Sequence, residues 1–216
     1  MKKILNKRLE SLCAFIEESD TVLDIGCDHA LLEIYLTLNK NIKIIGSDIN
    51  IGPLEKAKDN LKKYHLENKI ELRLGDGLET MSDDINTIVI SGMGGLSIIN
   101  ILKDINKYSN VSKLVLSPNN DFSLTRKKIC DLGFKIVREK IVLEQGKYYL
   151  ISEFIKGHED IDYYFGKLDL NDEIVKKYYQ YIYDKNLKII NEIGNKSNKK
   201  INIIRKENCY IIENIK

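Results

Sequence analysis

The sequence lacks any stretch that could carry the chain into or across a membrane. No uncharged apolar run approaches the roughly 18 residues that a spanning helix needs. The N-terminus begins with basic residues but reaches Glu10 before any long apolar stretch, which is not the order of a signal peptide. We therefore expect no contact with a membrane and a cytoplasmic location.

Closely spaced metal-ligand pairs are also missing. The cysteines are scattered and form no C-x-x-C pair: Cys13, Cys27, Cys130 and Cys209. Histidine is scarce as well, with only His29, His65 and His158. Structural zinc requires clustered ligands, so we expect no metal and thiols that stay reduced and mostly buried.

A large net charge of either sign is absent, because 34 basic and 32 acidic side chains leave a formal charge of +2. The total therefore says nothing about nucleic acid. One segment, residues 196–206, nevertheless carries five positive charges and no negative one. Such a run is most simply a solvated helix face, and in an RNA-binding chain it would supply phosphate contacts.

The 216 residues are 43% hydrophobic and alternate apolar strand-like runs with helical patterns up to about residue 157. That alternation predicts an α/β fold with a parallel sheet covered on both faces. The predicted strands are 21–26, 43–49, 70–76, 87–93, 113–118, 135–143 and 148–154. Helices are expected at 6–18, 29–39, 53–64, 95–107 and 121–132. The last two strands flank a tight turn at 144–147 and should pair antiparallel.

After Gly157 the sequence becomes polar and rich in Lys, Tyr and Ile, with a helical period. We predict two domains, at 1–157 and 158–216, the second a coiled-coil-like helical hairpin that binds tRNA if the chain acts on tRNA. The expected helices are 171–192 and 198–215. Their apolar stripes are expected at Ile174, Tyr178, Tyr181 or Ile182, Lys185 and Ile189, and at Ile201, Ile204, Cys209 and Ile212.

The clearest motif follows the first predicted strand, where a tight turn opens a helix as in nucleotide-binding Rossmann units. After Gly26, the positions of the usual second and third glycines hold Asp28 and Ala30. A pyrophosphate would be repelled by the Asp28 carboxylate, whereas the sulfonium and ammonium of S-adenosylmethionine tolerate it. This motif favours that cofactor over NAD. The residues expected to contact it here are Asp24, Gly26, Cys27, Asp28 and His29; a purely local hydrogen-bonding role for His29 stays open.

Acidic residues end the next two predicted strands. Asp48 lies 22 residues beyond Gly26, where a carboxylate accepts the ribose hydroxyls, and Ile49 follows it. Asp76 and Gly77 close the third strand, where the carboxylate can accept from the adenine amino group. Each Asp alone could be a turn former. In order after successive strands, they predict S-adenosylmethionine binding.

Two further loops end the fourth and fifth predicted strands. Residues 91–95 hold three glycines within four positions, which is costly unless the backbone bends or approaches a ligand. We expect the cofactor to contact Ser91, Gly92, Met93 and Gly94, and the substrate to contact Gly95. In the fifth loop, Pro118 would hold Asn119 against a base edge, although Pro-Asn-Asn-Asp is also an ordinary turn.

Together these segments resemble the bacterial tRNA (adenine(22)-N1)-methyltransferases. The resemblance rests on D-x-G-x-D-H-A at 24–30 and G-M-G-G at 92–95, and it extends to residues 5–9, 52–54, 75–78, 117–119 and 144–149. It covers residues 5 to about 157, and the tail in character only. In two places the chain departs from the family pattern: Ser117 stands where Gln is usual, and a Pro near Glu33 is missing.

The resemblance implies a class I methyltransferase fold and transfer of a methyl group from S-adenosylmethionine to N1 of adenine 22 in tRNA. Asp28 and Asn119 would be the catalytic residues that hold the base and offset its new charge. The tRNA would be bound by Lys7, Arg8, Lys199, Lys200 and Arg205, and we expect a monomer. Two alternatives remain open: methylation of another RNA or a small molecule, and a non-catalytic RNA-binding protein of the same fold.

Overall fold

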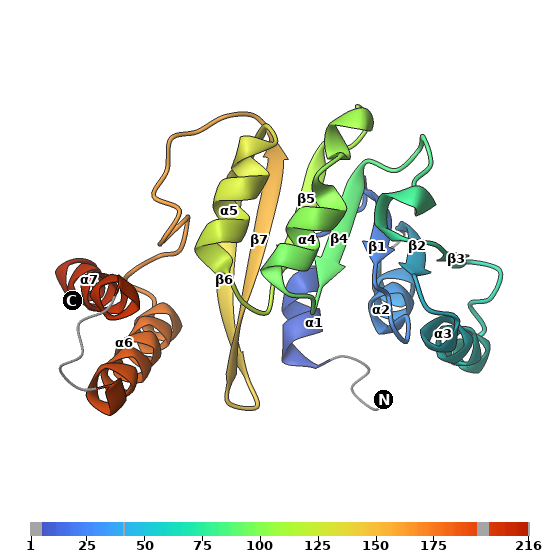
Figure 1. Cartoon of the computed structure of the whole chain (residues 1–216). Helices are drawn as coiled ribbons and strands as arrows, with labels where there is room; N and C mark the ends of the chain where they lie inside the picture. The colour runs from blue at the N-terminus through green and yellow to red at the C-terminus, as the bar shows by residue number, and fades with distance from the viewer. Residues whose placement is uncertain (1–5, 41, 194–198, 216) are drawn as a thin grey trace. The chain divides into compact units, whose positions relative to one another are not determined.

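One mixed sheet organises the N-terminal part of the chain. A computed structural model describes residues 6–40, 42–193 and 199–215. Within these residues, seven strands form a sheet in the order β3-β2-β1-β4-β5-β7-β6 (Figure 1). They are β1 (Thr21–Ile25), β2 (Lys43–Asp48), β3 (Glu71–Leu74), β4 (Thr87–Ser91), β5 (Lys113–Ser117), β6 (Phe134–Glu144) and β7 (Lys147–Lys156). Strands β1 to β5 pair in parallel, and β7 runs antiparallel to both its neighbours. The predicted Rossmann-like methyltransferase sheet is confirmed.

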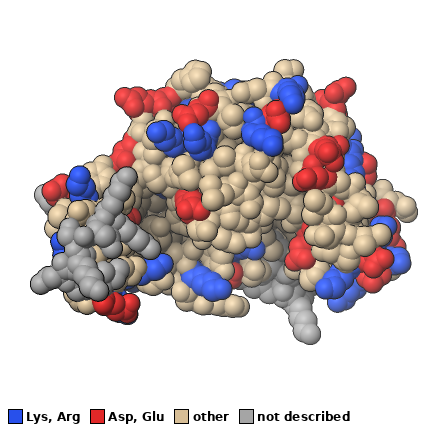
Figure 2. Space-filling view, in the orientation of Figure 1, with Lys and Arg blue, Asp and Glu red and all other residues tan. Residues whose placement is uncertain are grey.

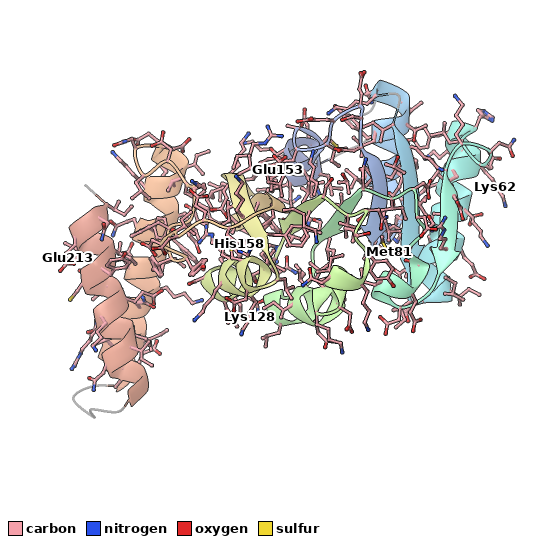
Figure 3. The ribbon with its side chains drawn as sticks, turned by 90° about the horizontal axis from the view of Figure 1, so that it is seen from above. Lys62, Met81, Lys128, Glu153, His158 and Glu213 are labelled. Carbon is pink, nitrogen blue, oxygen red and sulfur yellow. The ribbon has the colours of Figure 1, made fainter. Side chains whose placement is uncertain are left out.

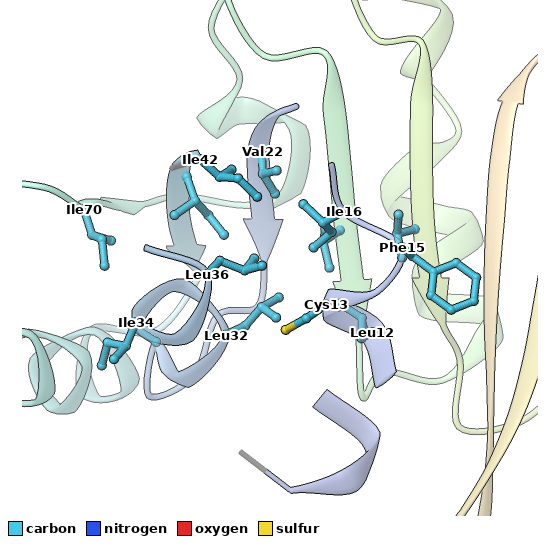
Figure 4. Close-up of a cluster of buried hydrophobic side chains, with 14 of the residues drawn as sticks. Leu12, Cys13, Phe15, Ile16, Val22, Leu32, Ile34, Leu36, Ile42 and Ile70 are labelled. Atoms are coloured by element: carbon cyan, nitrogen blue, oxygen red, sulfur yellow. The ribbon is translucent and has the colours of Figure 1, made fainter. Parts of the chain in front are cut away.

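The parallel strands are apolar on both faces because helices cover both. In β1, Val22 packs into one core cluster and Leu23 into the other, as successive side chains of a strand must. Helices α1 (Lys7–Cys13), α2 (Leu31–Asn39) and α3 (Ile51–Tyr64) contribute to the first cluster, part of which Figure 4 shows. Helices α4 (Gly95–Leu102) and α5 (Phe122–Asp131) contribute to the second, with the short 3₁₀ helices η1 (Gly77–Thr80) and η2 (Ile105–Lys107).

Helix α1 is shorter than the predicted 6–18. It ends at Cys13, whose carbonyl oxygen accepts a hydrogen bond from the Lys40 ammonium at 2.8 Å. The Lys40 ammonium also binds the Ile16 carbonyl, so one cation from the end of α2 takes two carbonyls that a longer helix would have paired internally. In the described part of the chain, no helix has both the length and the apolar character that a membrane crossing requires.

A cluster of buried charged side chains links the strands at the amino ends of the parallel strands, opposite the candidate site. Lys113 at the start of β5 lies 2.8 Å from Asp20 and 3.6 Å from Glu153, which Figure 3 labels on β7. Thr87 of β4 donates to Asp20 at 3.0 Å, and Arg138 pairs with Glu153. All polar groups in this cluster therefore have partners, as buried charge requires.

The segment after β7 is attached to the sheet domain by a second buried ion pair. Arg126 of α5 lies 2.9 Å from Glu139 of β6, and both side chains are almost fully buried. Arg126 also donates to the carbonyls of Tyr163 and Tyr164 at 3.1 and 2.7 Å, and the Lys167 N–H donates to Glu139 at 2.8 Å. The chain accordingly divides into compact units Met1–Lys167 and Leu168–Lys216, ten residues later than the expected boundary at 157.

The second unit contains two helices, α6 (Glu173–Ile193) and α7 (Lys199–Asn214), that pack on each other. The expected stripes are corrected here. On α6 the buried positions are Val175, Tyr179 and Asn186, so Lys185 is exposed and the stripe is shifted by one residue. On α7 they are Ile201, Ile204, Asn208 and Ile211, whereas Cys209 and Ile212 are exposed. The predicted break at residues 194–195 and residues 196–198 of the basic run lie outside the described residues.

Candidate active site

The candidate site lies at the carboxyl ends of the parallel strands, where β1 and β4 are neighbours and the strand order reverses. The turn after β1 is held by two N–H groups, of Gly26 and Cys27, that donate to the Ser47 carbonyl of β2 at 2.8 and 2.9 Å. Gly26 has φ +83°, and a Cβ at this position would overlap the end of Met93. The backbone conformation therefore favours glycine here, since the overlapping Met93 methyl is the end of a flexible side chain that can move aside.

The same turn holds two non-glycine residues in the left-handed region, Asp28 at φ 49° and Ala30 at φ 55°. Strained backbone of this kind persists where surrounding contacts enforce it. One such contact is the Asn60 amide of α3, which donates to the His29 carbonyl at 2.9 Å. The Asp28 side chain is 71% exposed and lies 3.4 Å from His29 Nε2, so its carboxylate faces outward from the turn.

Asp24 lies at the floor of the site beside a second carboxyl group that the sequence analysis did not assign. Asp24 is buried in β1, and Glu33 in the first turn of α2 is fully buried. Burial raises the pKa of Asp24 from 3.8 to about 7, opposed by a hydrogen bond with Glu33 and by the charge of Arg8. Burial also raises the pKa of Glu33 well above its usual value, and the charge of Asp24 raises it further.

The next two strands place acidic and apolar groups at the same edge. Asp48 ends β2; its carboxylate accepts the Asn50 N–H at 2.8 Å, and its carbonyl accepts the Gly75 N–H at 3.1 Å. That bond sets the turn that carries Asp76, an exposed side chain, next to Asp48. Ile49 is 60% exposed although apolar. An exposed isoleucine directly after Asp48 offers an apolar surface that a ligand can cover.

The loops after β4 and β5 are bonded to each other. The Gly92 N–H donates to the Ser117 carbonyl at 3.1 Å, and the Asn119 N–H donates to the Met93 carbonyl at 2.8 Å. The Asn119 side-chain amide donates to the Gly92 carbonyl at 2.6 Å. The side-chain N–H₂ of Asn119 is therefore held against the glycine loop, and its side-chain oxygen accepts no hydrogen bond from the described residues.

Gly95 and Pro118 were expected to contact the substrate, but they are also packed inside the structure. Both are buried. A Cβ on Gly95 would lie 2.5 Å from Thr125 Oγ1 and 2.8 Å from the Asn120 carbonyl, so only glycine lets α4 begin here. The Asn120 side chain accepts the Gly95 N–H at 2.9 Å and closes the start of α4. Their contact with a substrate stays a prediction.

Arg8 reaches from α1 to the end of β4. Its guanidinium donates to Ser91 Oγ at 2.8 Å and lies 5.2 Å from the centre of the Tyr149 ring. Gly92 also faces it, because a Cβ there would lie 3.3 Å from Arg8 Nη1. Lys7, the neighbouring residue, is exposed, and its N–H donates to Glu144. Arg8 therefore contacts the glycine loop of the site, and its expected phosphate contact stays a prediction.

The structure does not relate the tail residues to this site. Arg205 is exposed on α7, in the second unit, and the side chains of Lys199 and Lys200 lie outside the described part. Across the residues that the structure describes, no three His, Cys, Asp or Glu side chains are arranged to hold a metal ion.

Three residues of the site were missed from the sequence: Glu33, Asn120 and Tyr149. Acidic residues are common in the first turn of helices for electrostatic reasons, so a position at a helix start does not by itself distinguish Glu33. Asn120 follows Asn119 in an ordinary turn pattern. Tyr149 lies on β7, and its approach to Arg8 depends on tertiary packing. Only Glu33 had a usable signal, since it interrupts the apolar run Leu31, Leu32, Ile34.

S-adenosylmethionine fits the groups present. The left-handed Gly26 turn follows β1, Asp48 and Asp76 supply acceptors at the ends of β2 and β3, Ile49 beside Asp48 is exposed, and Asp24 places a buried carboxyl group two residues before the turn. A cofactor that carries hydroxyls, an apolar purine and positive charge finds one partner of each kind here.

Comparisons with known proteins agree with this geometry. The family described as "Methyltransferase domain" matches residues 5–152. The Bacillus subtilis tRNA (adenine(22)-N(1))-methyltransferase is 35% identical over 164 residues, which is 74% of this chain and 68% of that protein. A Streptococcus pneumoniae structure in complex with S-adenosyl-L-methionine has TM-score 0.89 and 30% identity over 98% of this chain and 100% of the other. The structure of M. capricolum TrmK in complex with S-adenosyl-homocysteine has TM-score 0.85 and 28% identity over 99% of this chain and 100% of the other.

Proposed function

The chain belongs to the tRNA (adenine(22)-N(1))-methyltransferase family, and from this premise we propose that it methylates N1 of adenine 22 in tRNA. The observation that carries this proposal is that Asp24, Asp48 and Asp76 lie at the carboxyl ends of three neighbouring strands, β1, β2 and β3, and that the glycine loop follows β4, the next strand of the sheet. S-adenosylmethionine supplies an activated methyl group on a sulfonium. A new bond forms between that methyl carbon and adenine N1 as the carbon–sulfur bond breaks, and the positive charge passes to the base.

The chain's own task in this reaction is orientation, because adenine N1 carries a nucleophilic lone pair. Asn119 has one amide N–H bound to Gly92, which fixes its plane against the loop. Asp28 presents an exposed carboxylate from a constrained turn. We propose that Asp28 accepts from the exocyclic amine and offsets the charge that methylation places on the base, while Asn119 and residues 91–94 position the ring.

Arg8 acts on this site indirectly, through its contacts with other residues of the protein. By bonding Ser91 and stacking on Tyr149 it holds the glycine loop in place, and its charge lies close enough to lower the pKa of Asp24. We propose a positioning role for Arg8, with phosphate contact as an additional role of its free edge.

Adenine N1 is engaged in base pairing or tertiary contacts, so exposing it costs a few kcal/mol that phosphate contacts must offset. Figure 2 shows acidic and basic side chains interspersed on one face of the molecule. The proposed phosphate contacts are therefore individual residues: Lys7 and Arg8 in the first unit, and Lys199, Lys200 and Arg205 in the second. The proposed working form is a cytoplasmic monomer that binds tRNA.

The test is incubation of the protein with S-adenosylmethionine and unmodified tRNA, followed by nucleoside analysis and mapping of the methylated position. We expect 1-methyladenosine at position 22. Methylation at another position, or of ribosomal RNA alone, would show that the proposed substrate is wrong and that the proposed methyl transfer is right. Tight cofactor binding without methylation of any RNA would favour a binding protein of this fold.

A further inference from the structure

Glu33 is a buried acid that the proposed reaction leaves without a role. It is fully enclosed, and within the described residues neither carboxyl oxygen has an N–H or hydroxyl donor. The carboxyl lies against the backbone of β2, because a Cβ on Gly46 would lie 2.6 Å from Glu33 Oε1. A carboxylate in such a place, with no donor and no cation, would be costly.

The acid beside it is Asp24. Asp24 of β1 is paired with Gly46 of β2, and side chains of paired residues lie on the same face of a sheet, so the Glu33 oxygen that lies against Gly46 lies beside the Asp24 carboxyl. Burial raises the pKa of both acids, and two carboxyl groups so placed can be bonded to each other only if one of them carries a proton. Two acids at one site titrate as a pair, and removing the last proton leaves two adjacent buried charges.

The other titratable groups around the pair do not take over this proton. Arg8 from α1 stays charged, and Asp48 from β2 is itself acidic and raises the pKa of Asp24. The thiol of Cys27, next to the pair, has its pKa raised by burial and then by Glu33. Burial also raises the pKa of Cys13 to about 12, so both thiols stay neutral at physiological pH.

We propose that Glu33 is a positioning residue for the cofactor: it shares one proton with Asp24, and this proton is released when the cationic cofactor binds above them. The proposal rests on the proposed cofactor site. In the free protein the Asp24–Glu33 pair carries one negative charge. When the shared proton leaves, the pair carries a second negative charge, which the ammonium group of the bound cofactor offsets. Proton release then couples affinity to pH, with affinity rising as the pH rises through neutrality.

Calorimetric titration of S-adenosylhomocysteine tests this in two buffers of different ionisation enthalpy, at pH 6, 7 and 8. For the wild type we expect close to one proton released near neutral pH and affinity that rises up to about ten-fold per pH unit. Glu33→Gln keeps a donor for Asp24 but has no proton to release, so its affinity should be nearly independent of pH. Any titration of the ligand's own amino group is common to both proteins and cancels in the difference.

Glu55→Gln is the matched control, because Glu55 is exposed on α3 and undergoes the same chemical change. It should behave as the wild type. Equal proton release in the wild type and Glu33→Gln would overturn the proposal. Failure of every protein to bind the ligand would contradict the proposed cofactor instead.

A measurement on the ligand-free wild type keeps the proposal testable if Glu33→Gln does not fold. With glutamate labelled at the carboxyl carbon, NMR should show one side chain titrating far above the ordinary value of about 4.3. Adding S-adenosylhomocysteine should move that titration to lower pH. A spectrum in which all glutamates titrate near the ordinary value would overturn the shared proton.

Discussion

At the scale of single residues, Asp28 and Asp48 both line the carboxyl edge of the sheet but differ in what holds them. Asp48 is the last residue of β2 and is bonded to the Asn50 N–H, whereas Asp28 projects from a left-handed turn with most of its side chain exposed. We propose that Asp48 binds the cofactor and that Asp28 contacts the base. The two assignments can be separated by kinetics.

Asp28→Asn should lower kcat about ten- to a hundred-fold and change cofactor affinity little. Asparagine tolerates the left-handed conformation, so the turn is kept and only the charge is lost. A charge-assisted hydrogen bond contributes about 1.5–3 kcal/mol, which corresponds to that range in rate. Single-turnover methylation of tRNA and calorimetry with S-adenosylhomocysteine measure the two quantities.

Asp48→Asn is the matched comparison and should show the reverse pattern. Its cofactor affinity should weaken by about 1.5–3 kcal/mol, with turnover largely recovered at saturating cofactor. Equal losses of affinity and rate in Asp28→Asn would make Asp28 a cofactor ligand. Unchanged affinity in Asp48→Asn would remove Asp48 from the site.

The residues that could be predicted from the sequence are those whose role follows from position along a strand. Asp24 lies next to the end of β1, Asp48 is the last residue of β2 and Asp76 follows β3, and parallel strands bring their carboxyl ends to the same side of a sheet. Arg8 and Glu33 could not be placed in this way. The bond of Arg8 to Ser91 and the burial of Glu33 beside Asp24 depend on how α1 and α2 pack on the sheet.

At the scale of elements, the strands were predictable because a sheet covered on both faces requires uninterrupted apolar runs. The tail helices were predictable in number and extent, but their contact faces were not. Asn186 of α6 and Asn208 of α7 are buried at the contact between the two helices. A search for apolar periodicity passes over a buried asparagine, so the predicted stripe of α6 was displaced by one residue from the buried face. The Asn186 amide donates to Asn208 at 3.0 Å and to Glu207 at 2.9 Å.

This asparagine pair should set the register of α6 against α7 at a cost in stability, as polar residues do in coiled-coil cores. Asn186→Leu alone should destabilise the tail by about 1–3 kcal/mol, because it deprives Asn208 of its partner. Asn186→Leu combined with Asn208→Leu should recover or exceed wild-type stability, because both polar groups are gone. Urea unfolding followed by circular dichroism measures these changes.

The control for the asparagine pair is Asn191→Leu, an identical change at an exposed position of α6. It should leave stability within about 0.5 kcal/mol. The double variant should also lose its unique register and form higher oligomers, visible by light scattering. A single variant as stable as the wild type would show that the amide bond contributes nothing.

At the scale of the whole molecule, the sheet and its site are complete within the first unit. All strands of the sheet end by Lys156, and the segment that follows is bonded to Arg126 and Glu139 up to Lys167. The extra ten residues could not be assigned from sequence, because the polar segment 158–167 has no periodicity and is held by a buried ion pair distant in the sequence. The position of a truncation therefore matters.

A chain ending at Lys167 should fold and bind S-adenosylhomocysteine like the full chain, but methylate tRNA with a raised KM. A chain ending at Gly157 should be less stable by at least about 1.5 kcal/mol, because Arg126 and Glu139 lose the carbonyl and N–H partners of residues 163–167. Thermal unfolding of the two chains in parallel checks this difference. Equal stability would show that the segment 158–167 contributes nothing to the first unit.

The salt dependence of tRNA binding tests the role of the tail itself. Each lost phosphate contact should reduce the slope of log affinity against log salt by somewhat less than about one unit. Removing the tail at Lys167 should therefore flatten the dependence, and Arg205→Gln with Lys206→Gln in the full chain should flatten it partly, since both side chains are exposed on α7. Filter binding at several salt concentrations gives the slopes. If the chain ending at Lys167 methylates tRNA at full efficiency in moderate salt, the basic run is a solvated helix face; if that chain unfolds, the tail is part of the folded core.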